Sequence, residues 1–248
     1  MGSVEQRSAG SHRLQRAIVR LAAPFWVPLA ALYLRFYKGY RIEGRAGLRE
    51  RFAQMRRESA APLLVCPNHL TLIDSALVVW ALVPVWKLAF LGNWLLWNVP
   101  ERENFARGPW QRAATYLAKC IPISRGGKRD EVAAVLARVT ELTRSGEVAL
   151  LFPEAGRSRS GRVEIESAAW GVGRIIASVP GCRVVCVYLR GQGQKSWSDL
   201  PMRGERFDVA VECIEPKSDQ RGARRSREFA RQVVTQLKEM EDRVQVGR

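Results

Sequence analysis

Apolar and polar positions along the chain form blocks that predict strands and helices in turn. Short runs rich in Val, Leu, Ile and Cys predict strands at 63–66, 120–123, 147–152, 183–189 and 207–214. Longer segments with apolar residues three and four positions apart predict helices at 46–58, 71–82, 88–98, 110–118, 129–144, 166–178 and 224–243. This alternation predicts an α/β fold, a mainly parallel mixed sheet flanked by helices, with the last strand antiparallel at an edge.

The first forty residues follow a different pattern. Residues 1–13 are small and polar, which predicts a disordered tail. Residues 14–37 are strongly apolar but are interrupted by Pro24 and Pro28, and their longest uncharged stretch is 14 residues, shorter than the roughly 20 that span a bilayer. We therefore expect 14–40 to be a helical membrane-binding motif that lies on or dips into one leaflet. A kinked helix buried in the core is the alternative. Residues 41–248 would form the main domain.

Charge and histidine content limit the chemistry. Forty Lys and Arg against 24 Asp and Glu leave a formal net charge of +16. An anionic partner is therefore expected: nucleic acid, a membrane surface, an acidic carrier protein or a phosphorylated small molecule. The chain has two histidines, His12 and His69, and no CxxC pair among its five cysteines. We therefore expect no metal site and no disulfide framework. Because His12 lies in the polar tail, a histidine base would have to be His69.

The first candidate site is the segment PNHLTLID, residues 67–74, directly after a predicted strand. If His69 lies in the loop ahead of the helix, its ring can fold back to Asp74 in the first turn. Asp74 would then fix the tautomer of the ring and leave the other nitrogen free as a base. The alternative is a capping box, in which Thr71 caps the helix and Asp74 only satisfies backbone donors.

The second candidate site is the segment FPEAGRSRSG, residues 152–161, which leaves the carboxyl end of another predicted strand. Such loops are where α/β sheets bind ligands. Arg157, Gly156 and Ser158 suit a phosphate. Glu154 would repel an anion, and it fits if it orients an arginine or binds a substrate hydroxyl. The alternative is a basic surface turn.

Three segments occur in an order that resembles a known family. NHLTLID, IPISRGG and FPEAGRS are similar to conserved blocks of the glycerolipid acyltransferases, typified by bacterial 1-acylglycerol-3-phosphate acyltransferase. The apolar N-terminus resembles the family's two-helix membrane motif, so the resemblance covers about residues 15–215. It implies an acyltransferase domain at 41–248, with His69 as general base and Asp74 as its orienting partner. The same resemblance implies roles in the first block for Asn68 and Thr71, and in acceptor binding for Arg125, Glu154, Gly156, Arg157 and Ser158.

The resemblance also implies substrates, partners and a location. The acyl donor would be acyl-CoA or acyl carrier protein, with no further cofactor. The acceptor would be a lysophospholipid such as 1-acylglycerol-3-phosphate. Departures from the acceptor-side blocks, such as Ala155-Gly156 for Gly-Thr, leave open a lyso-ornithine lipid or a polyene or other specialised lipid. The enzyme would bind an anionic membrane surface as a peripheral or monotopic protein on the cytoplasmic face of the inner cell membrane. The rival interpretations are a nucleic-acid-binding protein, which lacks a supporting motif here, and an inactive lipid-binding member of the same fold.

Overall fold

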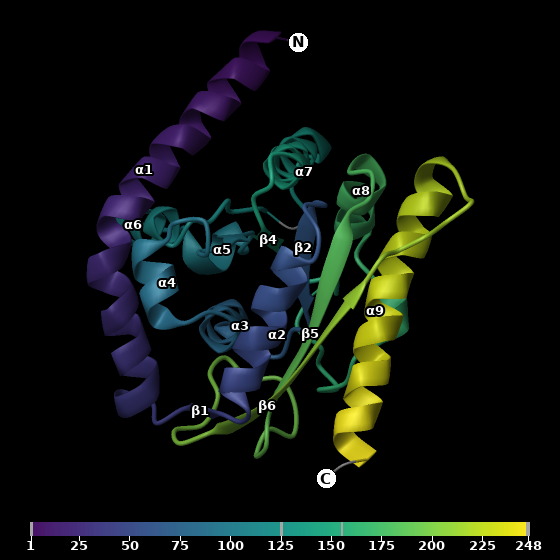
Figure 1. Cartoon of the computed structure of the whole chain (residues 1–248). Helices are drawn as coiled ribbons and strands as arrows, with labels where there is room; N and C mark the ends of the chain where they lie inside the picture. Colours follow the sequence, from purple (N-terminus) through teal and green to yellow (C-terminus); the bar gives the residue numbers. More distant parts are fainter. Residues whose placement is uncertain (1, 125, 155, 247–248) are drawn as a thin grey trace.

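A mixed sheet forms the centre of the protein in a computed structural model that describes residues 2–124, 126–154 and 156–246. The strand order is β1-β6-β5-β2-β4-β3 (Figure 1). The strands are β1 (Arg41–Ile42), β2 (Leu63–Pro67), β3 (Trp97–Asn98), β4 (Ala149–Leu150), β5 (Arg183–Gly191) and β6 (Arg206–Ile214). β5 and β6 pair antiparallel, and the other neighbours pair parallel. The predicted α/β class and mainly parallel mixed sheet are confirmed, but the antiparallel last strand, β6, lies between β1 and β5 rather than at the predicted edge.

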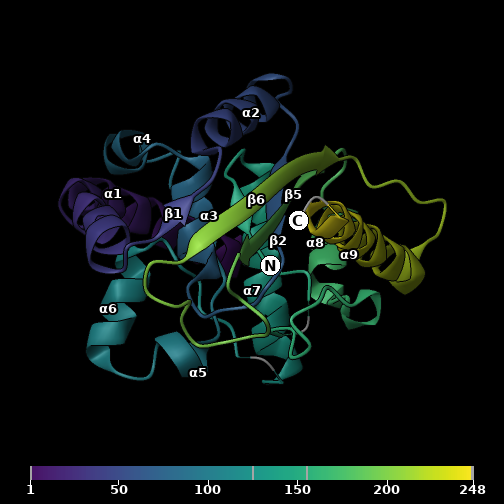
Figure 2. The same cartoon turned by 90° about the horizontal axis from the view of Figure 1, so that it is seen from below.

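Helices cover both faces of this sheet. They are α1 (Gly2–Leu32), α2 (Arg45–Arg57), α3 (Asp74–Leu82), α4 (Val85–Phe90), α5 (Arg102–Phe105), α6 (Pro109–Leu117), α7 (Arg129–Arg144), α8 (Trp170–Ser178) and α9 (Gly222–Val246). Alternate residues of β2 point to opposite faces. Leu63 and Val65 join a core with α1 to α4, whereas Leu64 and Cys66 join a core with α7 to α9. Viewed from below, α1 and α9 lie at opposite ends of the molecule (Figure 2).

Two predicted elements are wrong. Residues 88–98 do not form one helix, because α4 ends at Phe90 and the segment closes with β3. Residues 120–123 are not a full strand and pair only through isolated bridges, such as that between Asn98 and Cys120. Both segments are apolar at nearly every position, so they carry no periodicity that could separate a helix from a strand.

Helix α1 differs from its prediction in where it begins and in its continuity. It begins at Gly2 rather than near residue 14, and it continues through Pro24 and Pro28 as one helix. The expected two-helix interruption is therefore wrong, whereas the expected disorder of 1–13 stays a prediction. Polar residues near its start have tertiary partners: the side-chain amide of Gln15 donates to two backbone carbonyls, and the ring of His12 packs edge-on against Trp97.

A network of ion pairs at Glu147 connects α1 to the body of the protein. Glu147 accepts a hydrogen bond from Arg16 of α1 at 2.7 Å and one from Lys119 Nζ at 2.8 Å. Trp97 Nε1 donates to the same carboxylate at 2.9 Å. Burial alone would raise the pKa of Glu147, but the Lys119 ammonium and the donated hydrogen bonds hold this pKa below its ordinary value. Glu147 is therefore ionised at neutral pH and stabilises the docked position of α1.

The opposite face of α1 is apolar and exposed. Its side chains follow helical three- and four-residue spacing, so they form one stripe: Leu14, Ile18, Leu21, Phe25, Leu29, Leu32 and, in the following turn, Phe36. Among the described residues, one helical stretch, His12–Tyr37, is long and apolar enough to cross a membrane by length and composition. Its other side packs on α4 and α6, so the alternative of a fully buried core helix is wrong.

Candidate active site

The site lies at the carboxyl ends of strands β2, β4 and β5. β2 ends at Pro67, and residues 68–73 lead directly into α3. This segment is named the catalytic loop after the base predicted at His69. The segment after β4 runs beside this loop, because the two strands are parallel neighbours. The parallel topology therefore brings together the two segments that were singled out in the sequence, although they are more than 80 residues apart.

His69 lies ahead of the helix and its ring turns back to Asp74, as predicted. His69 Nδ1 is 3.1 Å from Asp74 Oδ2, and both residues are buried. A carboxylate at this distance favours the tautomer that carries its proton on Nδ1. The second ring nitrogen, Nε2, is then unprotonated and can act as a base.

Asp74 fulfils both of the roles that the sequence left open. Its Oδ2 also accepts the backbone N–H groups of Leu70 and Thr71, at 2.5 and 2.7 Å, and its Oδ1 accepts the Thr71 hydroxyl at 2.5 Å. It thus orders the catalytic loop as well as the ring. The expectation that Thr71 is the helix cap is wrong, because α3 begins at Asp74 and Ile73 holds the cap position.

Glu154 and Ser158 hold the backbone of His69 from both sides. Glu154 Oε1 accepts the His69 N–H at 2.9 Å, and the Ser158 N–H donates to the His69 carbonyl at 3.0 Å. The Ser158 hydroxyl is used within its own turn, where it donates to the Arg162 carbonyl. Glu154 and Ser158 thus position His69, and among the residues described no contact of Glu154 orients an arginine.

Burial changes the charge of Glu154. Its side chain is 3% exposed. Burial, partly opposed by the His69 N–H and reinforced by the nearby Asp74 charge, raises the pKa of Glu154 to about 8. At neutral pH this side chain is therefore mainly the neutral acid, so the repulsion of an anionic substrate that the sequence implied is largely removed.

Two further residues shape the site. Phe152 stacks on the His69 ring, with the ring centroids 3.9 Å apart and the planes 19° from parallel. Asn68 is buried and pairs with the backbone of Leu189 on β5 through both its amide nitrogen and its oxygen. Asn68 therefore anchors the start of the catalytic loop and does not reach the cavity. Phe152 lay in a segment singled out from the sequence, but nothing there indicated that its ring would stack on His69.

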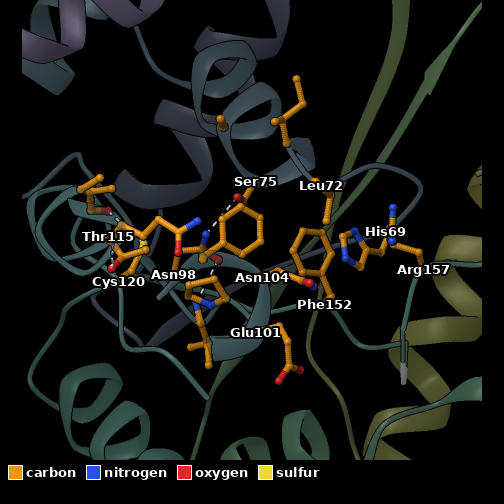
Figure 3. Close-up of a pocket in the computed structure, with 18 residues that line it drawn as sticks. His69, Leu72, Ser75, Asn98, Glu101, Asn104, Thr115, Cys120, Phe152 and Arg157 are labelled. Atoms are coloured by element: carbon orange, nitrogen blue, oxygen red, sulfur yellow. Dashed lines mark hydrogen bonds between the residues drawn. The ribbon is translucent and has the colours of Figure 1, made fainter. Parts of the chain in front are cut away.

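His69 lines a cavity of about 340 Å³, within the range typical of small-molecule sites. Figure 3 shows His69, Phe152 and Arg157 together at one side of it. On the far side Asn98 Nδ2 donates to Ser75 Oγ at 2.9 Å. Asn98 and Ser75 also line a second, almost wholly apolar cavity of about 160 Å³ between α1, α3 and α4.

Comparison with known proteins decides the family. A sequence model of the acyltransferase family matches residues 47–190, more than half of the chain. The chain belongs to the acyltransferase family. A comparison with curated proteins found no match.

The matched region of this acyltransferase contains every predicted site residue. Gly156 lies in the loop beside Arg157, with no contact that defines a role. Arg125 lies outside the described residues, so its predicted role in acceptor binding stays a prediction. Among the residues described, no group of three or more His, Cys, Asp and Glu could hold a metal ion.

Proposed function

We propose that this acyltransferase moves a fatty acyl group from a thioester, acyl-CoA or acyl carrier protein, to a free hydroxyl of a lysophospholipid such as 1-acylglycerol-3-phosphate. The observation that carries the proposal is the pairing of His69 with Asp74 at the wall of a cavity that is mainly apolar. An oriented imidazole beside an apolar cavity suits a lipid hydroxyl, which needs a base to attack a thioester at neutral pH.

The reaction would need one base and no covalent acyl-enzyme. His69 Nε2 removes the proton from the acceptor hydroxyl as its oxygen bonds to the thioester carbonyl carbon. Asp74 stabilises the imidazolium through the Nδ1 proton. When the intermediate collapses, the C–S bond breaks and the imidazolium returns its proton to the departing thiolate. The products are an ester and a free thiol, and His69 is neutral again.

The stacked ring of Phe152 and the two hydrogen bonds to the His69 backbone would keep the imidazole in place during this cycle. Two bonds to the backbone of His69, one from its N–H to Glu154 and one to its carbonyl from Ser158, leave little freedom for the loop to shift. Preorganisation of this kind matters because small displacements of a catalytic group are costly in rate.

The second cavity supports a place for the acyl chain. It is lined by apolar residues of α1, α3 and α4, and it shares Ser75, Ala76 and Asn98 with the cavity of His69. A chain whose carbonyl lies near His69 would extend past these residues toward α1. Burial of each methylene contributes about 0.8 kcal/mol, so a long chain would bind mainly through this surface.

The exposed stripe of α1 supports binding to a membrane surface. α4 adds Trp86 and Phe90, both exposed, beside α1, and such aromatic residues favour the headgroup region. Because α1 packs on α4 and α6, a spanning orientation would immerse those helices too. An interfacial position on an anionic leaflet therefore fits better, and the net charge of +16 favours it.

The test is product analysis with purified full-length protein. Acyl-CoA or acyl carrier protein is supplied with 1-acylglycerol-3-phosphate, a lyso-ornithine lipid or monoacylglycerol in mixed micelles. Mass spectrometry should detect a diacyl product with one free thiol released for each ester formed. Thiol release without an ester would show a thioesterase instead. Binding of acyl lipid without either product would show an inactive lipid-binding protein.

A further inference from the structure

The loop between β5 and β6, residues 192–205, lies against the catalytic loop. The Ser198 N–H donates to the Leu70 carbonyl at 3.1 Å, and the Leu72 N–H donates to the Asp199 carbonyl at 3.1 Å. These backbone bonds hold the middle of the 192–205 loop beside His69. The family match ends at residue 190, so this loop lies outside the matched region.

This loop supplies three contacts to Arg157, which also lines the cavity of His69. Arg157 Nη1 donates to Asp199 Oδ1 at 2.7 Å and to the Ser198 carbonyl at 3.2 Å. The Arg157 guanidinium carbon lies 4.8 Å from the centre of the Trp197 ring, as in a cation–π contact. The guanidinium of Arg157 is therefore already held by an anion, a carbonyl and an aromatic ring.

We infer that Asp199 is a specificity-determining residue that competes with the acceptor's phosphate for Arg157. This inference rests on the proposed acyl transfer to a lipid acceptor. A phosphate that approaches Arg157 from the cavity must displace the Asp199 carboxylate or share the guanidinium with it. A neutral headgroup makes no such demand. The loop therefore lowers the affinity for phosphomonoester acceptors and leaves the affinity for neutral acceptors unchanged.

The exposure of the two partners sets the size of this effect. The Asp199 side chain is 71% exposed, whereas that of Arg157 is 24% exposed. Asp199 can be rehydrated when it is displaced, so the ion pair opposes phosphate only weakly. Solvent-exposed pairs contribute little free energy, and removal of this one should tighten phosphate binding about two- to fivefold. Asp199 thus competes only weakly with phosphate for Arg157.

The test is equilibrium binding, which does not depend on turnover. Isothermal titration of the full-length protein in nonionic detergent would compare 1-oleoylglycerol-3-phosphate with 1-oleoylglycerol. Asp199→Asn, or Asp199→Ala, should bind the phosphate lipid about two- to fivefold more tightly than the wild type, with no change for the neutral lipid. Asp219→Asn is the matched control: it removes the same charge, but it follows β6 at the end of that strand away from the site.

A double-mutant cycle separates competition between Asp199 and phosphate for Arg157 from general charge repulsion between Asp199 and phosphate. In an Arg157→Gln background, Asp199→Asn should give no further gain, because the group for which it competes is absent. An unchanged affinity in Asp199→Asn, an equal gain for 1-oleoylglycerol, an equal gain in Asp219→Asn, or a full gain without Arg157 would each overturn the inference. Failure of the proposed function would instead appear as absence of ester product in the wild type, whatever the binding data show.

Discussion

The two contacts on the His69 backbone make Glu154 the most informative position to change. Glu154→Gln keeps the shape of the side chain and an oxygen that can accept the His69 N–H, which Glu154 now accepts at 2.9 Å. Because burial raises the pKa of Glu154 to about 8, the wild-type side chain is already mainly neutral at pH 7. We therefore expect Glu154→Gln to keep kcat within about threefold, because the Glu154 side chain takes no part in the proposed proton transfer.

The stability of this variant follows from proton linkage. Glu has an ordinary pKa of 4.5, and in the folded protein the pKa of Glu154 is about 8. Between these values the unfolded chain loses the proton while the folded protein keeps it, so stability falls as pH rises. At pH 7 the accumulated loss is about 3 kcal/mol. Gln does not titrate, so Glu154→Gln should be more stable than the wild type by less than about 1 kcal/mol at pH 5 and by up to about 3 kcal/mol at pH 7.

Glu154→Leu is the matched comparison. It fills a similar volume but leaves the buried His69 N–H without an acceptor, at a cost of about 1–3 kcal/mol. It should also lower kcat, because the catalytic loop loses one of its two anchors. Urea denaturation at pH 5 and pH 7, combined with ester formation at both pH values, measures each effect.

The refuting result is equally definite. If Glu154→Gln loses activity as severely as Glu154→Leu, then the ionised carboxylate itself is required, as in the sequence-based interpretation that Glu154 orients an arginine or binds the acceptor. The positioning role would then be wrong.

Three further expectations concern other parts of the molecule. Asp74→Asn should lower kcat at least about a hundredfold, because Asp74 orients the His69 ring. It should also lower the free energy of unfolding by about 2 kcal/mol, because Asp74 accepts the N–H groups of the loop. A lower melting temperature with unchanged kcat would leave Asp74 a structural role only. Glu147→Gln should cost about 3 kcal/mol of unfolding free energy at pH 7, since it leaves a buried Lys without its partner. The pKa of Glu147 is lowered, so this difference should shrink as pH falls below 4.5, the ordinary value for Glu; a constant difference between pH 3 and pH 7 would contradict the ion pair. Phe25→Asp should weaken flotation with anionic liposomes, whereas Trp170→Asp, at the exposed first residue of α8, should not. Equal loss in both would show that the stripe on α1 is not the membrane-binding face.

The parts of the fold that the sequence predicted are those with local signals. The apolar run at 183–189 became β5, and the strongly periodic segment 129–144 became α7 with the predicted bounds. The nearly charge-free region around residues 80–98 misled, because an almost continuously apolar sequence lacks the periodicity that separates helix from strand. The docking of α1 on the body of the protein gave no signal in the sequence for another reason. Its partners, such as Glu147 for Arg16, lie more than 100 residues away.

In the candidate site, too, local contacts could be predicted from the sequence and long-range contacts could not. His69 and Asp74 are five residues apart, so loop and helix geometry sufficed to predict that their side chains meet. The contact between Glu154 and the His69 N–H spans 85 residues, and that between Arg157 and Asp199 spans 42. Such contacts depend on strand order in the sheet, which the sequence pattern alone did not specify. The roles of these residues were therefore open until the topology was known.

The most direct test of the central claim is the turnover number of His69→Ala compared with that of His12→Ala. Both variants remove an imidazole, and His12 is the other histidine of the chain, buried away from the cavity of His69. With saturating acyl-CoA and acceptor, His69→Ala should lower kcat for ester formation about 10²- to 10⁴-fold, with an unchanged circular dichroism spectrum. His12→Ala should keep kcat near the wild-type value. A folded His69→Ala enzyme that forms ester at the wild-type rate would contradict the proposed base.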